Sequence, residues 1–481
     1  MKSVVKLFLP HRWVLRRLVF FLGLAACPAL CAAQAEGTAL PQSGNGTGII
    51  EDLLRGVLGL GFCIGLCVLF STHRRRIPWP LVAKALVLQL GIALLVLKVP
   101  AAQKMFEWVS KAFVKVLSFS SEGASFLFKS FGLGVMESPL QNFAFVILPV
   151  IIFFSALSSV LFFLGVLQKV VLAFAWLMRN TLKISGSESL AAAANIFLGQ
   201  TEAPLLIKPY IPGMTRSELM CLMTGGMATI AGSVFAAYVG YLGGSDPQAQ
   251  IFFAKHLLTA SVMSAPAAVA AAKILVPETA AINQSLEVNR EKIGANFLDA
   301  VSNGTADGIR LAINVAAMLL VFIAFVAMIN FILAKVGLWT GLNTLVQSIS
   351  GGRYAEFSLD SLLGILGAPI SWLLGVPRED MFVVGQLLGQ KTVLNEFYAY
   401  AQLGRLLQTP GSFTHTKSVL MCTYILCGFA NLASIGIQIG GIGALAPSRK
   451  SELASLGFLA LLGGTVASLF TAVLVGMVYG L

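Results

Sequence analysis

Long apolar runs recur along this chain, and most of its basic residues stand in the short segments between them. The first run covers residues 49–72 and is followed at once by Arg74, Arg75 and Arg76. Hydrophobic residues make up 57% and charged residues 11% of the 481 residues, whereas a soluble domain has about 25% charged residues. Because the basic residues follow the positive-inside rule, the net charge of +12 indicates membrane topology and no nucleic-acid partner. The chain is predicted to be an all-α polytopic protein of the lipid bilayer.

The apolar runs predict about eight transmembrane helices. They lie at about residues 49–72, 81–99, 139–166, 218–241, 250–274, 309–335, 417–445 and 454–480. The amphipathic stretch 101–131, which contains Trp108, predicts an interfacial helix. Because the arginines place the end of the first span in the cytoplasm, we expect a bacterial inner-membrane protein with both termini in the periplasm.

The N-terminal segment has the pattern of a targeting sequence. Basic residues precede a short apolar run at 18–26, and the small residues up to position 35 follow. This predicts a signal peptide at 1–35 and a periplasmic tail at 36–47. Leu24-Ala25-Ala26-Cys27 also resembles a lipobox, so lipidation of Cys27 stays open.

A polar stretch, Asn-Ile-Phe-Leu-Gly-Gln-Thr-Glu-Ala-Pro at 195–204, interrupts sequence that otherwise suits the membrane interior. A carboxylate at that depth costs about 2.5–3.5 kcal/mol on insertion scales and is tolerated only beside a partner or a water-filled cavity. Basic residues flank the region on both sides, which predicts a re-entrant hairpin entering from the cytoplasm. A similar pattern at 357–410, containing Gly389-Gln390-Lys391 and Asn395-Glu396-Phe397, predicts a second hairpin entering from outside.

The two blocks share one order and face opposite ways. Each has a hairpin with Leu-Gly-Gln at its polar tip, then a span rich in small residues, then an apolar span. Paired interrupted segments in inverted halves indicate a transporter site at the midplane of the bilayer. After the N-terminal segments we expect scaffold helices 1–3 with the interfacial helix at 48–185, the first hairpin with helices 4–5 and a cytoplasmic segment at 186–308, helix 6 and an outer segment at 309–356, and the second hairpin with helices 7–8 at 357–481.

Four motifs in this order resemble the concentrative nucleoside transporter family, over residues 48–481. They are Gly-Gln-Thr-Glu-Ala-Pro at 199–204, Ala-Thr-Ile-Ala-Gly-Ser-Val at 228–234, Gly389-x-Lys391-x-x-x-Asn395-Glu396-Phe397, and Cys-Gly-Phe-Ala-Asn at 427–431 continuing through Ser-Ile-Gly at 434–436. The resemblance implies secondary active import of nucleosides by alternating access. It also implies a homotrimer in which each protomer carries a site between two hairpin tips and two broken helices.

The same resemblance implies which residues contact the nucleoside. Those expected at the base are Gln200, Thr201, Glu202 and Val234, and those expected at the sugar are Glu396, Phe429, Asn431 and Ser434. Amide, hydroxyl and carboxylate groups can pair with the polar edge of a base and with ribose hydroxyls. The Gly199-Gln200 pair resembles the broad or pyrimidine-accepting pattern, so uridine is an expected substrate.

By resemblance, the coupling ion is Na⁺, held by side-chain oxygens of Asn195 and Thr229 and backbone carbonyls of Leu198 and Ile230. Proton coupling stays open, because Glu202 or Glu396 can titrate. One elementary charge moved through 100 mV contributes about 2.3 kcal/mol, and tenfold accumulation needs about 1.4 kcal/mol. One cation per nucleoside is therefore enough.

Three other classes of protein also have polar groups within membrane helices. A membrane enzyme is disfavoured, because the four histidines form no His-Glu-x-x-His motif and no Gly-x-Ser-x-Gly motif occurs. A channel can also be built from broken helices, but two hairpins of opposite orientation favour alternating access. A nucleoside receptor would bind without accumulating its ligand.

Overall fold

The computed structural model describes residues 48–128, 143–244, 246–280, 282 and 296–480, and every regular element in these ranges is helical. The predicted signal peptide at 1–35, the tail at 36–47 and Cys27 lie outside the described residues. The all-helical fold class predicted from the sequence is confirmed.

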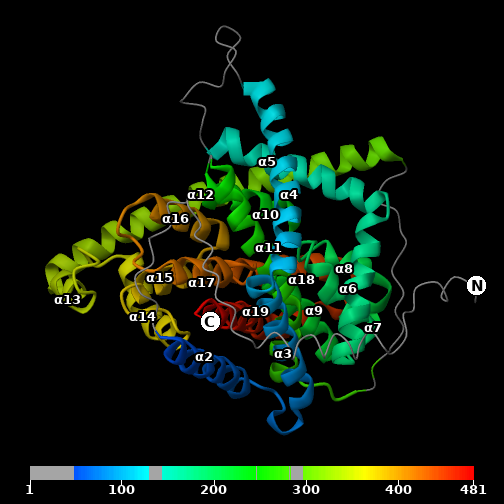
Figure 1. Ribbon diagram of the computed structural model, residues 1–481, viewed down its shortest axis with the longest axis horizontal. Helices are drawn as coiled ribbons and strands as arrows, with labels where there is room; N and C mark the ends of the chain where they lie inside the picture. The colour runs from blue at the N-terminus through cyan, green and yellow to red at the C-terminus, as the bar shows by residue number, and fades with distance from the viewer. Residues whose placement is uncertain (1–47, 129–142, 245, 281, 283–295, 481) are drawn as a thin grey trace, which may run out of the picture. The chain divides into compact units, whose positions relative to one another are not determined.

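The helices fall into a first half that runs to α11 and a second half from α12 onward (Figure 1). The first half contains α2 (Ile49–Leu69), α3 (Trp79–Lys98), α4 (Pro100–Phe128), α5 (Phe143–Phe163), α6 (Val166–Leu182), α7 (Gly186–Asn195), α8 (Ala203–Leu206), α9 (Arg216–Ala228), α10 (Gly232–Gly243) and α11 (Pro247–Leu275). The second half contains α12 (Phe297–Thr340), α13 (Leu342–Ile349), α14 (Leu359–Leu373), α15 (Met381–Val393), α16 (Glu396–Gln408), α17 (Thr416–Leu426), α18 (Leu432–Leu445) and α19 (Lys450–Tyr479). Short 3₁₀ turns at Arg74–Arg76, Lys208–Gly213 and Pro447–Arg449 connect some of these helices.

Seven helical segments in the described part of the chain are long and apolar enough to cross a membrane. They match seven of the eight predicted spans. The remaining predicted span, 417–445, is divided into α17 and α18, which have 11 and 14 residues. Each is shorter than the ~20 residues that a helix needs to cross the hydrocarbon core alone.

Helix α12 is much longer than the span predicted at 309–335. It has 44 residues and begins inside the segment 276–308, which was expected to be polar and cytoplasmic. At 1.5 Å per residue it measures about 66 Å, roughly twice the 30 Å hydrocarbon core. It packs along α5 and ends next to α13 at the left of Figure 1. Only 17% of its most apolar stretch is buried within this chain, so most of its apolar surface is not covered by the other described helices.

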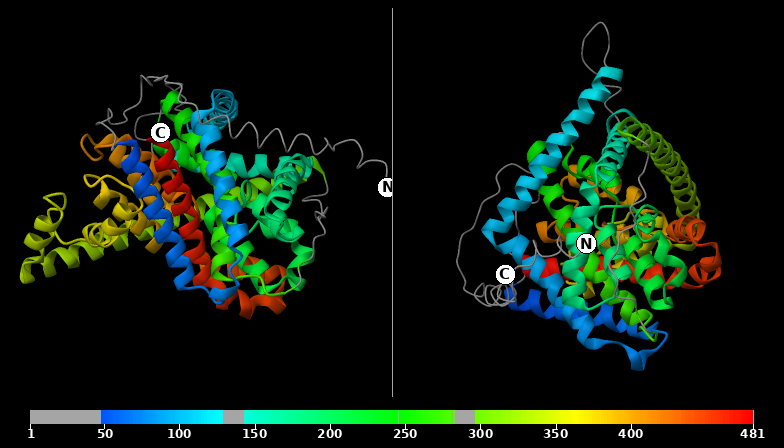
Figure 2. Two further views of the ribbon diagram at one scale, coloured as in Figure 1. Left: turned by 60° about the horizontal axis from the view of Figure 1, so that its bottom comes forward. Right: turned by 90° about the vertical axis from the view of Figure 1, so that its right-hand side faces the viewer.

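Helices α9, α10, α11 and α19 form the interior. The share of buried residues in the most apolar stretch is 94% for the segment that contains α9 and α10, 89% for α11 and 78% for the segment Pro447–Tyr479, which contains α19. These helices pack against one another, and α19 also packs against α2 (Figure 2). The broken helix of the first half is therefore held on several sides by the core.

Three helices, α6, α13 and α14, were not predicted. α6 follows a left-handed turn at Gly165, with φ of 71°, and packs against α7. α14 runs along α15 so closely that a Cβ on Gly367 would lie 2.5 Å from the carbonyl oxygen of Gly385. The second block therefore has three helices, α14, α15 and α16, where a hairpin of two was expected.

The expectation that Leu-Gly-Gln marks both hairpin tips is wrong for the second block. At 198–200 the tripeptide lies in the non-helical segment between α7 and α8. Helix α8 then begins with Pro204 in its first turn. At 388–390 it lies within α15, because the residues that follow continue the helix to Val393. The break comes at Leu394, and Asn395 caps α16 by accepting a 2.8 Å hydrogen bond from the N–H of Tyr398.

Candidate functional site

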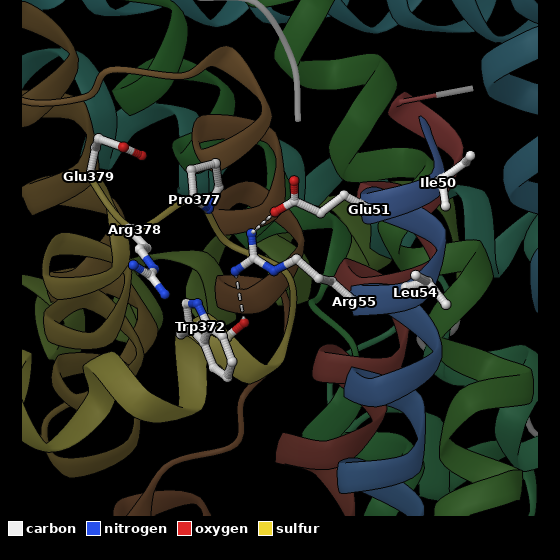
Figure 3. Close-up of a pocket in the computed structure, with 8 residues that line it drawn as sticks. All are labelled: Ile50, Glu51, Leu54, Arg55, Trp372, Pro377, Arg378 and Glu379. Carbon is white, nitrogen blue, oxygen red and sulfur yellow. Dashed lines mark hydrogen bonds and ion pairs between the residues drawn. The ribbon is translucent and has the colours of Figure 1, made fainter. Parts of the chain in front are cut away.

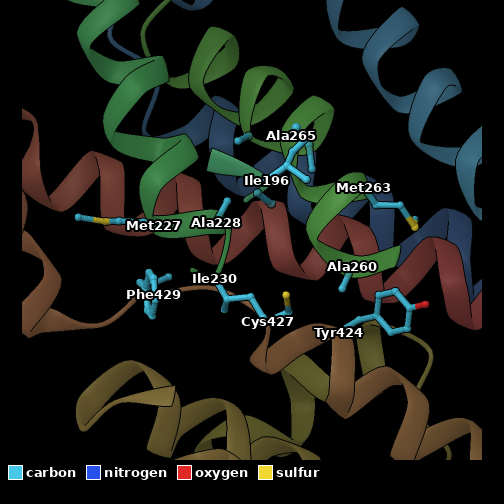
Figure 4. Close-up of a cluster of buried hydrophobic side chains, with 14 of the residues drawn as sticks. Ile196, Met227, Ala228, Ile230, Ala260, Met263, Ala265, Tyr424, Cys427 and Phe429 are labelled. Atoms are coloured by element: carbon cyan, nitrogen blue, oxygen red, sulfur yellow. The ribbon is translucent and has the colours of Figure 1, made fainter. Parts of the chain in front are cut away.

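Two helices of the interior are each interrupted, and the two interruptions meet. The first break covers residues 229–231 between α9 and α10, and the second covers 427–431 between α17 and α18. The N–H of Phe429 donates a 3.3 Å hydrogen bond to the carbonyl of Thr229. Figure 4 shows residues of both breaks, including Ile230, in one buried cluster with side chains of α11. The family resemblance implied two broken helices, and the structure shows where they break and that the two breaks are in contact.

The contact between the breaks depends on a glycine. Gly428 has φ of 129°, a conformation that side chains disfavour. A Cβ at this position would lie 2.8 Å from the carbonyl oxygens of both Met227 and Ala228. Because both neighbours are backbone atoms at the end of α9, the two breaks can approach this closely only with glycine here.

The tip of the first hairpin closes onto both broken helices. The N–H of Gly232, the first residue of α10, donates a 3.1 Å hydrogen bond to the carbonyl of Phe197. The side-chain Nε2 of Gln200 donates a 3.2 Å hydrogen bond to Oγ of Ser434 on α18. The predicted base-binding residue Gln200 therefore lies beside the predicted sugar-binding residue Ser434.

Glu396 begins α16 and is buried at the second tip. Its carboxylate accepts a 2.7 Å hydrogen bond from Nδ2 of Asn431 and a 3.3 Å hydrogen bond from the hydroxyl of Tyr238. Oδ1 of Asn431 accepts a 2.9 Å hydrogen bond from the N–H of Ser434 and so caps α18. The cap orients the Asn431 amide, and the amide in turn orients the carboxylate.

Six of the eight residues predicted to contact the nucleoside are buried around this meeting point: Gln200, Val234, Glu396, Phe429, Asn431 and Ser434. The other two, Thr201 and Glu202, are exposed. Glu202 folds back on its own tip, where its carboxylate accepts a 3.2 Å hydrogen bond from the N–H of Gly199. Thr201 lies against α18, since a Cβ on Gly441 would be 2.9 Å from its methyl group.

The residues predicted to hold a cation lie where α7 and α9 end. Asn195 is buried, and neither atom of its amide has a hydrogen-bond partner among the described residues. A Cβ on Gly225 would lie 2.8 Å from its Nδ2, so this side chain faces the last turn of α9. Oγ1 of Thr229 donates a 2.9 Å hydrogen bond to the Gly225 carbonyl and keeps its lone pairs, and Leu198 and Ile230 are buried next to these residues in the chain. Neutral oxygen donors of this kind suit a hard monovalent cation.

The charge at the helix ends agrees with the expected separation of cation residues from nucleoside residues. α7 and α9 end at the predicted cation residues, and the C-terminal end of a helix carries partial negative charge. α16 and α18 begin at Glu396 and Asn431, where backbone N–H groups are available to polar ligands. Cations are therefore favoured at one side of the meeting point and hydroxyl-bearing ligands at the other.

The base of the first hairpin is fixed by buried charges. Ser185 and Glu188 form a capping box that starts α7. Glu188 also makes a short ion pair with Lys273 near the end of α11, and Lys273 donates a 2.9 Å hydrogen bond to Oγ of Ser217 on α9. These contacts fix α7, α9 and α11 relative to one another, and this fixes the position of the first hairpin's tip against α9.

Sequence reasoning gave no role to two residues that complete the site. Tyr238 lies one helical turn after Val234 on α10, and this spacing alone places both on one face. Lys391 was noticed as part of a motif, but its fully buried ammonium donates a 2.7 Å hydrogen bond to the carbonyl of Ile425 on α17. No local pattern in the sequence reveals that partner.

A cavity of about 710 Å³ lies elsewhere, between α2 and the turn from α14 to α15 (Figure 3). Arg55 enters it and donates hydrogen bonds of 3.1 Å and 2.7 Å to the carbonyls of Trp372 and Val376. Arg55 also forms a 3.7 Å ion pair with Glu51. None of the candidate site residues lines this cavity, so we place the site by the convergence of polar groups.

Comparison with known proteins assigns the chain to a family. Residues 256–476 match the family model described as the C-terminus of Na⁺ dependent nucleoside transporters, residues 58–131 match the corresponding N-terminus, and residues 144–245 match a model described as nucleoside recognition. An uncharacterized transporter of Haemophilus influenzae is 39% identical, over 89% of this chain and 99% of the relative. The structure of CNTnw in an inward-facing substrate-bound state is 37% identical with a TM-score of 0.78, over 89% of this chain and 99% of that one.

The chain belongs to the concentrative nucleoside transporter family. Sodium/nucleoside cotransporter 1 of Rattus norvegicus is 38% identical, over 87% of this chain and 63% of that longer protein. A CNTnw variant in an outward-facing state also matches, with 36% identity and a TM-score of 0.78 over 89% of this chain and 98% of that one. The family expected from the four motifs is confirmed. CNTnw, a relative of this concentrative nucleoside transporter, has known structures in both an outward-facing and an inward-facing state.

Proposed function

We propose that this protein imports nucleosides by symport with Na⁺, through alternating access. One observation carries the proposal: Gln200 from the first hairpin, Glu396 from the second, and Asn431 and Ser434 from a broken helix are joined by hydrogen bonds of 2.7–3.2 Å. These groups come from both inverted halves, as an alternating-access site requires. The protein is a carrier and not an enzyme, and its ligand leaves chemically unchanged.

The donors and acceptors match a nucleoside with a pyrimidine base, such as uridine. Glu396, Asn431 and Ser434 bind the ribose hydroxyls beside the ring of Phe429, because a carboxylate and an amide can take vicinal hydroxyls as donors and acceptors. At the other end Gln200, Thr201 and Glu202 meet the polar edge of the base, directly or through water, and Val234 packs on its face. Glu202 reaches the base by leaving its present contact with Gly199.

The coupling ion is Na⁺, held by Asn195, Leu198, Thr229 and Ile230. The amide of Asn195, unpartnered among the described residues, and the neutral oxygens around it support this choice, as does the similarity to the rat sodium/nucleoside cotransporter. Because Phe429 is hydrogen-bonded to Thr229, ion binding at one break bears directly on the sugar residues of the other. The same contact couples the two ligands.

Thr229→Val tests the ion site. Valine has nearly the same shape but lacks the hydroxyl oxygen, so the Na⁺ concentration for half-maximal uptake should rise about tenfold, equivalent to about 1.4 kcal/mol. The control is Thr224→Val on the same helix, whose buried hydroxyl has no partner among the described residues and lies outside the ion set. Uptake in sodium titrations should be normal for that control. An unchanged sodium dependence in Thr229→Val would reject this ligand.

We place the protein in a bacterial inner membrane as a homotrimer, with a cleaved signal peptide at 1–35 and both ends of the mature chain in the periplasm. The proposed division remains the first hairpin with helices 4–5 at 186–308 and the second hairpin with helices 7–8 at 357–481, on the scaffold at 48–185 and the sixth helix at 309–356. Large apolar side chains on α12, such as Leu320 and Phe331, are exposed in the single chain, and this supports contact with lipid or neighbouring subunits.

Uptake by purified protein in liposomes tests the function. Labelled uridine is supplied under an inward Na⁺ gradient, an inward proton gradient or neither, with adenosine as competitor. Na⁺-driven accumulation is the expected result. Proton-driven accumulation would assign coupling to Glu202 or Glu396, equilibration without accumulation would indicate a channel, and binding without uptake a receptor.

A further inference from the structure

Lys391 lies in the last turn of α15, and Asn195 is the last residue of α7. α7 packs against α9 and brings Asn195 to the last turn of that broken helix, next to Gly225. α15 packs against α17 and brings Lys391 to the last turn of that broken helix, where its ammonium donates a 2.7 Å hydrogen bond to the carbonyl of Ile425. Asn195 thus faces the C-terminal end of α9, and Lys391 faces the C-terminal end of α17.

The hydrogen bonds of the Lys391 ammonium go to oxygens of neutral groups, and the buried carboxylate of Glu396 interacts with it electrostatically. Besides Ile425, it donates a 3.1 Å hydrogen bond to Oγ of Ser468 on α19. Ser468 in turn donates a 2.9 Å hydrogen bond to the carbonyl of Cys427, the first residue of the break. Lys391 is fully buried. Its positive charge therefore acts on the carbonyl end of α17, which carries partial negative charge.

We propose that Lys391 is a fixed cation that does for the second broken helix what Na⁺ does for the first. It holds the carbonyl end of α17 so that residues 427–431 keep the conformation that presents Phe429 and Asn431 to the sugar. In this role it is a positioning residue for the nucleoside and not a ligand of it. The inference rests on the proposed function for its link to transport, whereas its structural part stands alone.

Two neutral replacements separate charge from hydrogen bonding. Lys391→Met removes both, and Lys391→Gln keeps a donor for the Ile425 carbonyl but no charge. Both are expected to raise the KM for uridine at least tenfold. Hydrogen exchange measured by mass spectrometry should be faster at the amides of 427–431 in both variants. Wild-type KM and exchange in a folded Lys391→Met would overturn the proposal, and so would wild-type behaviour of Lys391→Gln, which would leave the charge without a role.

Ser468→Ala decides the question if the lysine variants do not fold. It removes the link to the Cys427 carbonyl but keeps the ammonium, so we expect about a threefold rise in uridine KM and faster exchange at 427–431. Thr465→Ala is the matched control, because this α19 hydroxyl donates a 2.9 Å hydrogen bond to the carbonyl of Leu461 within its own helix. Equal results for the two α19 variants would overturn the proposal. If wild-type protein takes up no uridine, the proposed function fails, and the exchange measurements still decide the role of Lys391.

Discussion

Replacing Glu396 by glutamine is expected to lower uridine uptake, measured as Vmax/KM in liposomes, about 100-fold. The carboxylate is buried, and two neutral donors, Asn431 and Tyr238, orient it in the absence of ligand. Hydrogen bonds to a charged group contribute about 1.5–3 kcal/mol each, and an amide oxygen makes weaker ones. With two ribose hydroxyls affected, a loss of about 2.7 kcal/mol, or 100-fold, follows.

The Glu396→Gln variant should still fold, because glutamine can accept the hydrogen bond from Nδ2 of Asn431. Competition with 2′,3′-dideoxyuridine gives a sharper test of the sugar assignment. The wild-type protein should strongly prefer uridine, and the variant should lose most of that preference. Glu107→Gln on α4 is the control, since that exposed carboxylate pairs only with Lys111 among the contacts described for it, and uptake should be unchanged. Wild-type discrimination by Glu396→Gln would remove Glu396 from the sugar site.

Replacing Gly428 by alanine is expected to abolish Na⁺-driven uridine uptake. The added Cβ would lie 2.8 Å from two backbone carbonyl oxygens at the end of α9, and neither can move without moving the first break. The residue would also occupy a conformation with φ of 129°, for which strain of about 1–3 kcal/mol is typical. The hydrogen bond from Phe429 to Thr229 joins the breaks and would be lost, so both the ion site and the sugar site should be disturbed.

Gly436→Ala is the matched control for this change. Gly436 lies in α18, and a Cβ built there meets no atom within 4 Å. Alanine should be tolerated at this position and stabilise the helix by about 0.5–1 kcal/mol. In detergent, Gly428→Ala should melt several degrees below wild type, and Gly436→Ala at or above it. Normal transport by a folded Gly428→Ala would show that the close contact of the two breaks is not needed.

These variants test one arrangement, in which backbone hydrogen bonds join the two broken helices to each other and to the tip of the first hairpin. Broken helices leave unpaired carbonyls and N–H groups inside the protein. Here the N–H of Phe429 is satisfied by the carbonyl of Thr229, and the N–H of Gly232 by the carbonyl of Phe197. Both of these N–H groups are thus paired by a carbonyl of another segment.

The sequence by itself determined the membrane class, seven spans, the interruption at 195–204 and the family. These properties are local. A run of about 20 apolar residues is enough to predict a span, and polar residues with glycine inside such a run are enough to predict a break. The four motifs also identified the residues that the structure brings together around Glu396 and Ser434.

Only the tertiary structure decided how the pieces are joined. The helix α14 was missed because its packing depends on the approach of Gly367 to Gly385, a contact between residues 18 positions apart. The tripeptide Leu-Gly-Gln predicted two equivalent tips, yet Gln390 is helical and Gln200 is not. The partner of Lys391 lies 34 residues away on another helix. Buried polar groups in the membrane interior must find partners wherever the fold provides them, so the sequence indicates that these residues need partners, and the packing of the helices decides which partners they have.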